Sequence, residues 1–154
     1  MERRISVRVQ LAKFLILVLI MLSAESSWAE ATVVLVTGKG SPIEHISSLD
    51  IRKAYLGILV KIDEKTVHPV RRRDDKHLNQ IFLQSVIAMS QRSYERRLLS
   101  LLLRLGTPRP VMVNDNDALV QMLTSRPIAI GYMWKSDAEA DDRVRIIKVL
   151  WQET

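Results

Sequence analysis

Three consecutive arginines, Arg71 to Arg73, are the side chains best suited to ligand chemistry, because a guanidinium binds oxyanions through paired hydrogen bonds. They end a segment of strand character, Val67 to Arg72 (VHPVRR), and Asp74 and Asp75 follow directly. The adjacent carboxylates leave two interpretations open. Either the arginines coordinate an anion, or they form a solvated charge cluster with the two aspartates.

Ser41 is a second side chain that could donate a hydrogen bond to an oxyanion. It lies in a turn-forming cluster, Gly38-Lys39-Gly40-Ser41-Pro42, directly after the β-branched run Thr32 to Thr37. A serine in such a position also serves as an ordinary turn or cap residue, and the sequence leaves both roles open. The candidate anion-binding residues are therefore Ser41, Arg72 and Arg73.

Enzymatic and metal chemistry have little support in the sequence. His45, His68 and His77 share no regular spacing, and the chain contains no cysteine, so no metal site is expected. The sequence contains no nucleophile elbow, no HExxH zinc motif, no Walker loop and no pair of carboxylates on an evident scaffold. We expect no catalytic residue, no metal and no cofactor, and predict that the protein is not an enzyme.

Strand-like and helix-like segments alternate along the chain, which predicts an α/β structure with a largely parallel sheet. The predicted strands are Thr32 to Thr37, Val67 to Arg72, Val111 to Val113, Ile128 to Tyr132 and Val144 to Leu150. The predicted helices run from Ser47 to Gly57, from His77 to Met89, from Ser90 to Leu105 and over the residues behind Asp115. Pro69 is expected to push its strand toward an edge or an irregular position, because proline has no N–H to donate.

The stretch from Asn114 to Trp134 (NDNDALVQMLTSRPIAIGYMW) is the segment around which the others are arranged. Asp115 and Asp117 lie in the first turn of its helix, where the helix dipole favours negative charge. Pro127 cannot continue the helix, so the chain leaves it and re-enters as a strand that is apolar on both faces. Such a strand indicates a sheet that is covered on both sides.

The first 29 residues have the layout of a secretory signal peptide. A basic start precedes the unbroken apolar run Phe14 to Leu22, and Ser27-Trp28-Ala29 supplies small residues two apart. The run is short for a spanning helix, which needs about 20 apolar residues. We expect cleavage after Ala29, with Ala31 as the alternative site and an uncleaved N-terminal anchor as the alternative fate. The predicted organisation is a signal peptide over residues 1–29 and one domain over residues 30–154.

Charge and cysteine content fit an exported protein. Removing the four basic and two acidic residues of the leader lowers the formal net charge from +6 to about +4. This charge can attract anions, but the aromatic residues do not interleave with the basic ones, so no nucleic acid partner is expected. A chain without cysteine forms no disulfide, which suits a soluble protein of a bacterial periplasm.

The order of the segments resembles the short PstS-like proteins among the phosphate-binding receptors of ABC transporters. Ile51 to Gly57 is similar to the LRxIFLG segment of that family, Met89 to Tyr94 to its MSxxxY segment, and Ala129 to Tyr132 to its AIGY segment. The resemblance covers about Val33 to Trp134 and implies a single lobe of the type 2 periplasmic-binding (PBP-like) fold. It also implies phosphate or a similar oxyanion as ligand, and an ABC transporter permease or an envelope sensor protein as partner.

The sequence departs from this family in the loop after the second strand. Full-length phosphate binders carry a Gly-Ser-Gly-Thr loop there, whose amides and hydroxyls cradle the oxyanion at a helix N-terminus. Here the stretch from Arg72 to Leu78 has two carboxylates and none of those glycines or hydroxyls, and only Arg72 transfers directly.

The sequence therefore leaves two alternative functions open. The first is a periplasmic solute-binding protein that holds an oxyanion for ABC-type uptake or sensing. The second is a ligand-free accessory or interaction module of the cell envelope that retains the fold. In the second function, a series of arginines presents a surface to an envelope protein, or steers anions without binding them: Arg92, Arg96, Arg97, Arg104 and Arg109.

Overall fold

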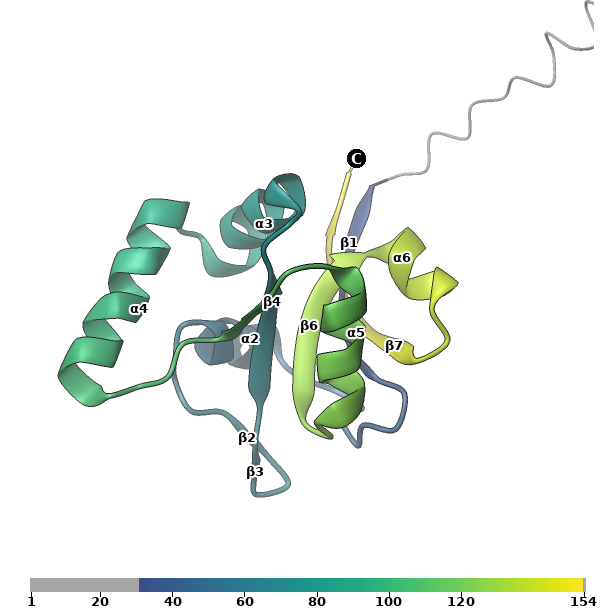
Figure 1. Cartoon of the computed structure of the whole chain (residues 1–154), viewed down its shortest axis with the longest axis horizontal. Helices are drawn as coiled ribbons and strands as arrows, with labels where there is room; N and C mark the ends of the chain where they lie inside the picture. Colours follow the sequence, from purple (N-terminus) through teal and green to yellow (C-terminus); the bar gives the residue numbers. More distant parts are fainter. Residues whose placement is uncertain (1–30, 154) are drawn as a thin grey trace, which may run out of the picture.

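The computed structural model describes residues 31–153, and its elements confirm the α/β class (Figure 1). The strands of the main sheet are β1 (Thr32–Gly38), β4 (His68–Arg72), β5 (Val111–Val113), β6 (Ala129–Trp134) and β7 (Val144–Gln152). A separate small hairpin consists of β2 (Lys61–Ile62) and β3 (Lys65–Thr66). The helices are α2 (Ser48–Tyr55), α3 (Lys76–Phe82), α4 (Gln91–Leu105), α5 (Asn116–Ser125) and α6 (Lys135–Ala140), and a π-helical turn, η1 (Leu83–Ile87), follows α3.

The main sheet is mixed and mostly parallel, as predicted. Its strand order is β5-β4-β6-β1-β7, and β4 runs parallel to both β5 and β6. The reversed strand is β1, which pairs antiparallel with β6 on one side and β7 on the other. All seven residues of β1 are buried, so the β-branched run predicted as a buried first strand lies inside the sheet.

Pro69 does not place its strand at an edge, because β4 lies between β5 and β6. The expectation of an edge position is wrong for the strand as a whole, and the register explains why the proline is tolerated. Pro69 is paired with Ile130 of β6, whereas pairing with β5 begins only at Val70. The missing N–H therefore falls where β4 has a neighbour on one side only.

Each face of the sheet packs against its own helices, which confirms the covered sheet predicted from the apolar AIGY strand. One core cluster joins the sheet to α2, α3, η1 and α4, and within it the rings of Phe82 and Tyr132 stack with centroids 3.8 Å apart. The other cluster joins the sheet to α5 and α6 around Leu119, Val120 and Met133. In Figure 1, α4 lies on the side of the molecule away from β1 and β7.

Capping residues mark the helix starts that the sequence predicts. The side chain of Ser47 accepts from the amide of Asp50 at 3.0 Å, and that of Asp115 accepts from the amide of Ala118 at 2.8 Å. Ser90 likewise accepts from the amide of Ser93 at the start of α4.

The single helix predicted from His77 to Met89 is wrong in its second half. The α-helix ends at Phe82, and the chain continues as the π-helical turn η1. The amide of Met89 closes this turn on the carbonyl of Leu83 at 3.1 Å, and Ala88 adopts a left-handed conformation with φ of 56°. The wider turn and the left-handed residue redirect the chain into α4.

The predicted signal peptide lies outside the described residues. Within residues 31–153, no helix has the length and apolar character needed to cross a membrane.

Candidate functional site

The parallel pairing of β4 with β5 brings the carboxyl ends of both strands to one edge of the sheet, where Arg71, Arg72 and Arg73 leave β4. Side chains alternate along a strand, so Arg72 points to the opposite face from Arg71. Arg72 contacts residues of α5 and α6, whereas Arg71 contacts residues of α4. Arg71 and Arg72 therefore occupy two different environments.

The guanidinium of Arg72 is held by groups of the chain itself. Its Nε and Nη2 donate to the two carboxylate oxygens of Asp74 at 3.0 and 2.8 Å, and its Nη1 donates to Oδ1 of Asn116 at 3.0 Å. A carboxylate oxygen of Asp137 lies 3.7 Å from Nη1. The hydrogen bonds from Arg72 keep the pKa of the Asp74 carboxyl below its ordinary value. An anion that binds Arg72 would have to compete with these internal partners.

Asp75 occupies the start of α3, at the loop where the resemblance implies glycines and hydroxyls. One of its carboxylate oxygens accepts from the amide of Leu78 at 2.9 Å, and the other accepts from the indole N–H of Trp134 at 2.8 Å. This carboxylate satisfies an amide that would otherwise be free for an anion.

Arg71 faces the opposite side of β4 and is almost fully enclosed, with 3% of its surface exposed. Its Nη1 donates to Glu95 at 3.1 Å, and its guanidinium lies 4.7 Å from the centroid of the Tyr94 ring. Its Nε has no hydrogen-bond partner among the described residues. A buried guanidinium with an unused donor is suited to hold a further acceptor.

A cleft of about 560 Å³ opens on this side of β4, between α3, η1 and the start of α4. Cationic residues line it together with polar amides, one hydroxyl and three apolar residues, and no carboxylate is among its lining residues. The lining residues are Arg71, Arg72, Arg73, Lys76, Asn79, Gln80, Leu83, Gln84, Met89, Ser90, Gln91 and Met112. Within the described residues, Arg73 and Lys76 form no ion pair of 4.0 Å or less, unlike Arg71 and Arg72.

Tyr132, the last residue of the AIGY segment, positions the floor of this cleft. Its hydroxyl donates to Oδ1 of Asn79 at 2.5 Å, and Nδ2 of Asn79 donates to the carbonyl of Arg72 at 2.8 Å. Burial raises the pKa of Tyr132, against the effect of the nearby Arg71 cation, so the phenol remains a donor at neutral pH. The chain of contacts fixes α3 to the carboxyl end of β4.

Ser41 lies at the other end of the sheet, because β1 runs antiparallel to β6 and its carboxyl end meets the start of β6. Its hydroxyl donates to the carbonyl of Pro127 at 2.5 Å and accepts from the amide of Ile43 at 3.3 Å. The structure thus brings Arg72 and Arg73 to one edge and places Ser41, buried, at the opposite edge. The contacts of Ser41 are those of a turn residue.

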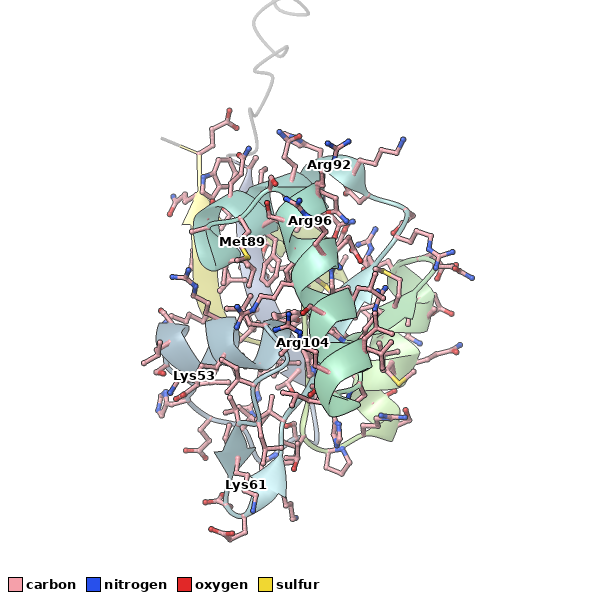
Figure 2. All side chains as sticks on the ribbon, turned by 90° about the vertical axis from the view of Figure 1, so that its left-hand side faces the viewer. Lys53, Lys61, Met89, Arg92, Arg96 and Arg104 are labelled. Atoms are coloured by element: carbon pink, nitrogen blue, oxygen red, sulfur yellow. The ribbon has the colours of Figure 1, made fainter. Side chains whose placement is uncertain are left out.

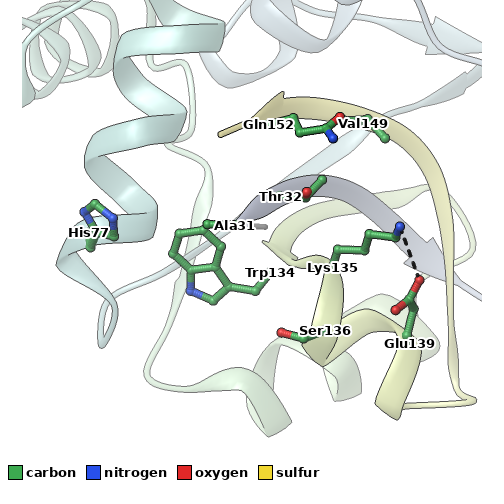
Figure 3. A pocket seen from close by; sticks show the side chains of 9 residues that line it. All are labelled: Ala31, Thr32, His77, Trp134, Lys135, Ser136, Glu139, Val149 and Gln152. Carbon is green, nitrogen blue, oxygen red and sulfur yellow. Dashed lines mark ion pairs between the residues drawn. The ribbon is translucent and has the colours of Figure 1, made fainter. Parts of the chain in front are cut away.

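A second hollow, of about 550 Å³, lies beside Trp134 and the start of α6 (Figure 3). Its lysine, Lys135, is paired with Glu139 at 3.6 Å, and the ring of His77 lies 5.7 Å from that of Trp134. Paired charges make this hollow less suited to an anion than the cleft beside β4. In the described part of the chain, no group of His, Cys, Asp and Glu side chains could hold a metal ion.

Neither a protein-family model nor a curated protein sequence matches the chain. Several solved structures, however, do match the fold of the chain. An ABC-type phosphate transport receptor from Vibrio cholerae aligns with a TM-score of 0.56 and 13% identity over 77% of this chain and 46% of the receptor. PstS from Borrelia burgdorferi aligns with a TM-score of 0.55 and 15% identity over 77% of this chain and 47% of its own. The chain has a PstS-like fold.

A third PstS-like neighbour is a putative phosphate ABC transporter substrate-binding protein from Clostridium perfringens, solved with bound phosphate. It aligns with a TM-score of 0.53 and 17% identity over 77% of this chain and 45% of its own. The chain thus spans less than half the length of each of these neighbours. At such identities the likeness establishes the fold, and the resemblance read from the segment order is confirmed at that level.

Proposed function

We propose that this PstS-like protein is a solute-binding protein of the periplasm that holds phosphate or a similar oxyanion in the cleft beside β4. The observation that carries the proposal is the lining of that cleft, which includes the cationic residues Arg71, Arg73 and Lys76 and no carboxylate. Because Arg73 and Lys76 have no ion-pair partner within 4.0 Å in the described chain, their charge is free to attract an anion.

The chemistry of the lining suits an oxyanion in three respects. Arg73 offers a planar fork of donors, Lys76 a mobile point charge, and Arg71 an enclosed cation with an unused Nε. The cleft is lined on its α4 side by Ser90 and Gln91, whose side chains can donate further hydrogen bonds. The low exposure of Arg71 strengthens its own interaction with an anion relative to the same interaction in water.

The neighbouring structures support the same ligand class, since their names describe phosphate transport receptors and one was solved with phosphate bound. By this analogy the protein delivers its anion to an ABC transporter permease or reports it to an envelope sensor protein. A binding role of this kind requires no catalytic residue, and we propose that the protein is not an enzyme. The proposed location is the periplasm, reached through the predicted signal peptide.

A second candidate function, a ligand-free interaction module of the envelope, is favoured by the internal pairing at the end of β4. Asp74 engages Arg72 through two hydrogen bonds, and Asp75 occupies the start of α3. Both carboxylates fill positions that an oxyanion would otherwise take. In this function the cleft retains its shape and binds no solute.

Isothermal titration of the processed protein with phosphate, sulfate and related oxyanions separates the two functions. The solute-binding function predicts saturable heat with at least one of these anions and a rise in melting temperature at saturating ligand. The ligand-free function predicts neither. Titration with neutral sugars provides the control, because a cationic cleft offers them no charge-assisted hydrogen bond.

A further inference from the structure

Helix α4 buries little of its surface for its length. Of its 15 residues only Tyr94 and Leu98 are buried, and the hydroxyl of Tyr94 donates to the carbonyl of Tyr55 at 2.6 Å. In water, isolated helices of this length are marginally stable, and most of their stability in proteins comes from packing. The exposed side of α4 is therefore available for an interaction outside the described fold.

The outer face of α4, which we define as Arg92, Arg96, Leu99 and Leu103, lies opposite the buried residues. These positions follow the spacing i, i+4, i+7 and i+11, so they form one stripe along the helix. Leu99 is 44% exposed and Leu103 is 76% exposed. Figure 2 shows Arg92, Arg96 and Arg104 spread along the helix on the side that faces the viewer.

Further apolar side chains are exposed near the C-terminal end of α4, beside this stripe rather than on it. Leu102 and Leu105 of α4 are exposed, and so are Ile58 and Leu59 in the loop after α2. That loop lies against the C-terminal half of α4, because a Cβ atom on Gly57 would lie 3.2 Å from Cδ1 of Leu101. The exposed leucines are thus concentrated in the C-terminal half of α4, where Arg104 also lies.

The charge of this surface is uncompensated. Among the described residues, Arg92, Arg96 and Arg104 form no ion pair of 4.0 Å or less, whereas the single carboxylate of α4, Glu95, is engaged by Arg71 at 3.1 Å and Arg109 at 3.6 Å. No residue of the outer face lines the cleft beside β4. The outer face is therefore a separate, cationic and apolar surface.

We infer that the outer face of α4 docks on an anionic phospholipid bilayer. Arginines beside leucines on one exposed helix are the composition of a helix that lies in the membrane interface, with cations at the headgroup phosphates and apolar groups at the acyl boundary. A second copy of the chain is disfavoured as occupant, since it would bring the arginines of two helices together. An anionic bilayer complements both the charge and the exposed leucines.

Co-sedimentation with phospholipid vesicles tests this inference on the processed chain beginning at Glu30, which contains every described element and lacks the apolar leader. We expect binding to vesicles that contain phosphatidylglycerol and none to pure phosphatidylcholine vesicles. Binding should weaken as salt rises from about 0.1 M to about 0.5 M, because the Debye length shortens.

Two variants and their matched controls locate the contact. Arg92→Gln with Arg96→Gln should lower the vesicle partition coefficient about 25-fold, at about fivefold per arginine near the surface. Lys39→Gln with Arg126→Gln removes the same charge from exposed residues outside α4 and should leave binding within about twofold of wild type, because distant charges are screened. Leu103→Gln should lower binding several-fold, whereas Val149→Gln, at a 52% exposed residue of β7, should not.

Several outcomes would overturn the inference. Absence of binding to phosphatidylglycerol vesicles would do so, and so would equal losses in the α4 variants and their controls. If the protein did not bind vesicles but self-associated, and Leu103→Gln abolished the self-association, the surface would instead be a contact with a second copy of the chain. None of these outcomes bears on the cleft, because the variants leave all its lining residues intact.

Discussion

Arg72 and Asp74 form an ion pair whose contribution to stability depends on pH. The pKa of the Asp74 carboxyl is lowered in the folded protein, chiefly by its hydrogen bonds to Arg72. Because the folded-state pKa is lowered, the pair stabilises the fold fully above the unfolded-state pKa of about 3.9. This stabilisation is lost as the pH falls further and Asp74 becomes protonated in the folded protein.

Asp74→Asn should therefore reduce the free energy of unfolding at pH 7, and the difference from wild type should shrink below about pH 4. Urea denaturation of both proteins across this range measures it. Asp142→Asn is the control, since Asp142 is exposed and forms no ion pair within the described residues. A wild-type advantage over Asp74→Asn that stays constant down to pH 2 would show that the pair is not responsible.

Asp75 opposes anion binding in the proposed function, because its carboxylate lies at the start of α3 beside the cleft. Asp75→Gly should increase the affinity for phosphate about threefold to tenfold by removing a nearby like charge. It should also cost about 1–2 kcal/mol of stability, since the cap on Leu78 and the bond from Trp134 are lost.

Ser47→Gly is the matched control for the Asp75 substitution, because Ser47 caps α2 in the same way and lies outside the cleft. It should lower stability without changing affinity. If both variants changed affinity equally in calorimetry, the effect would come from general loosening of the fold and the role assigned to Asp75 would be wrong.

At the scale of elements, the packing of β6 against α5 depends on Gly131. A Cβ atom at this position would lie 2.7 Å from Cδ1 of the fully buried Leu119. Gly131→Val should therefore cost about 1–3 kcal/mol through overpacking. Thermal or urea denaturation measures the loss.

Gly40→Val provides a control for that substitution, because a Cβ at Gly40 would meet no atom within 4 Å. Combining Gly131→Val with Leu119→Ala should cost less than the sum of the two separate changes, since the space vacated by Leu119 accepts the new side chain. Strict additivity, or unchanged unfolding of Gly131→Val alone, would show that this contact is not tight.

The elements that the sequence predicts best are those with local signals. Ser47, Ser90 and Asp115 mark helix starts through their caps, and Gly106, with φ of 64°, marks the end of α4. Helix α6 has no such signal, because Trp134 precedes it and forms no side-chain cap, and the sequence gives no warning of it. The π-helical turn is equally hidden, since its residues continue the apolar spacing of α3.

The residues of the candidate site also differ in whether a local sequence signal identifies them. Arg72 and Arg73 are recognisable because they end a strand, and strand ends are local features. The separation of Ser41 from them follows from the reversed direction of β1, which depends on pairing with β6 and β7 and leaves no trace in the local sequence. Lys76 and Asn79 join the cleft only through the placement of α3 over β4, so the local pattern does not identify them.

At the scale of the whole molecule, export is a prediction that the described residues do not test. We expect the processed protein to begin at Glu30 and to be recovered in soluble periplasmic extract. N-terminal sequencing of the purified protein measures this. An intact leader recovered in a membrane fraction would support the uncleaved anchor instead.

Calorimetric titration with phosphate of wild type and of Arg73→Gln with Lys76→Gln tests whether an oxyanion binds in the cleft of this single PstS-like lobe. Loss of both unpaired cations should weaken binding at least about 10- to 100-fold, because each forms a charge-assisted contact with the anion. Lys39→Gln with Arg126→Gln, of equal net charge, should bind as wild type does. Equal affinities in all three proteins, or no heat from wild type with any oxyanion, would contradict oxyanion binding in this cleft.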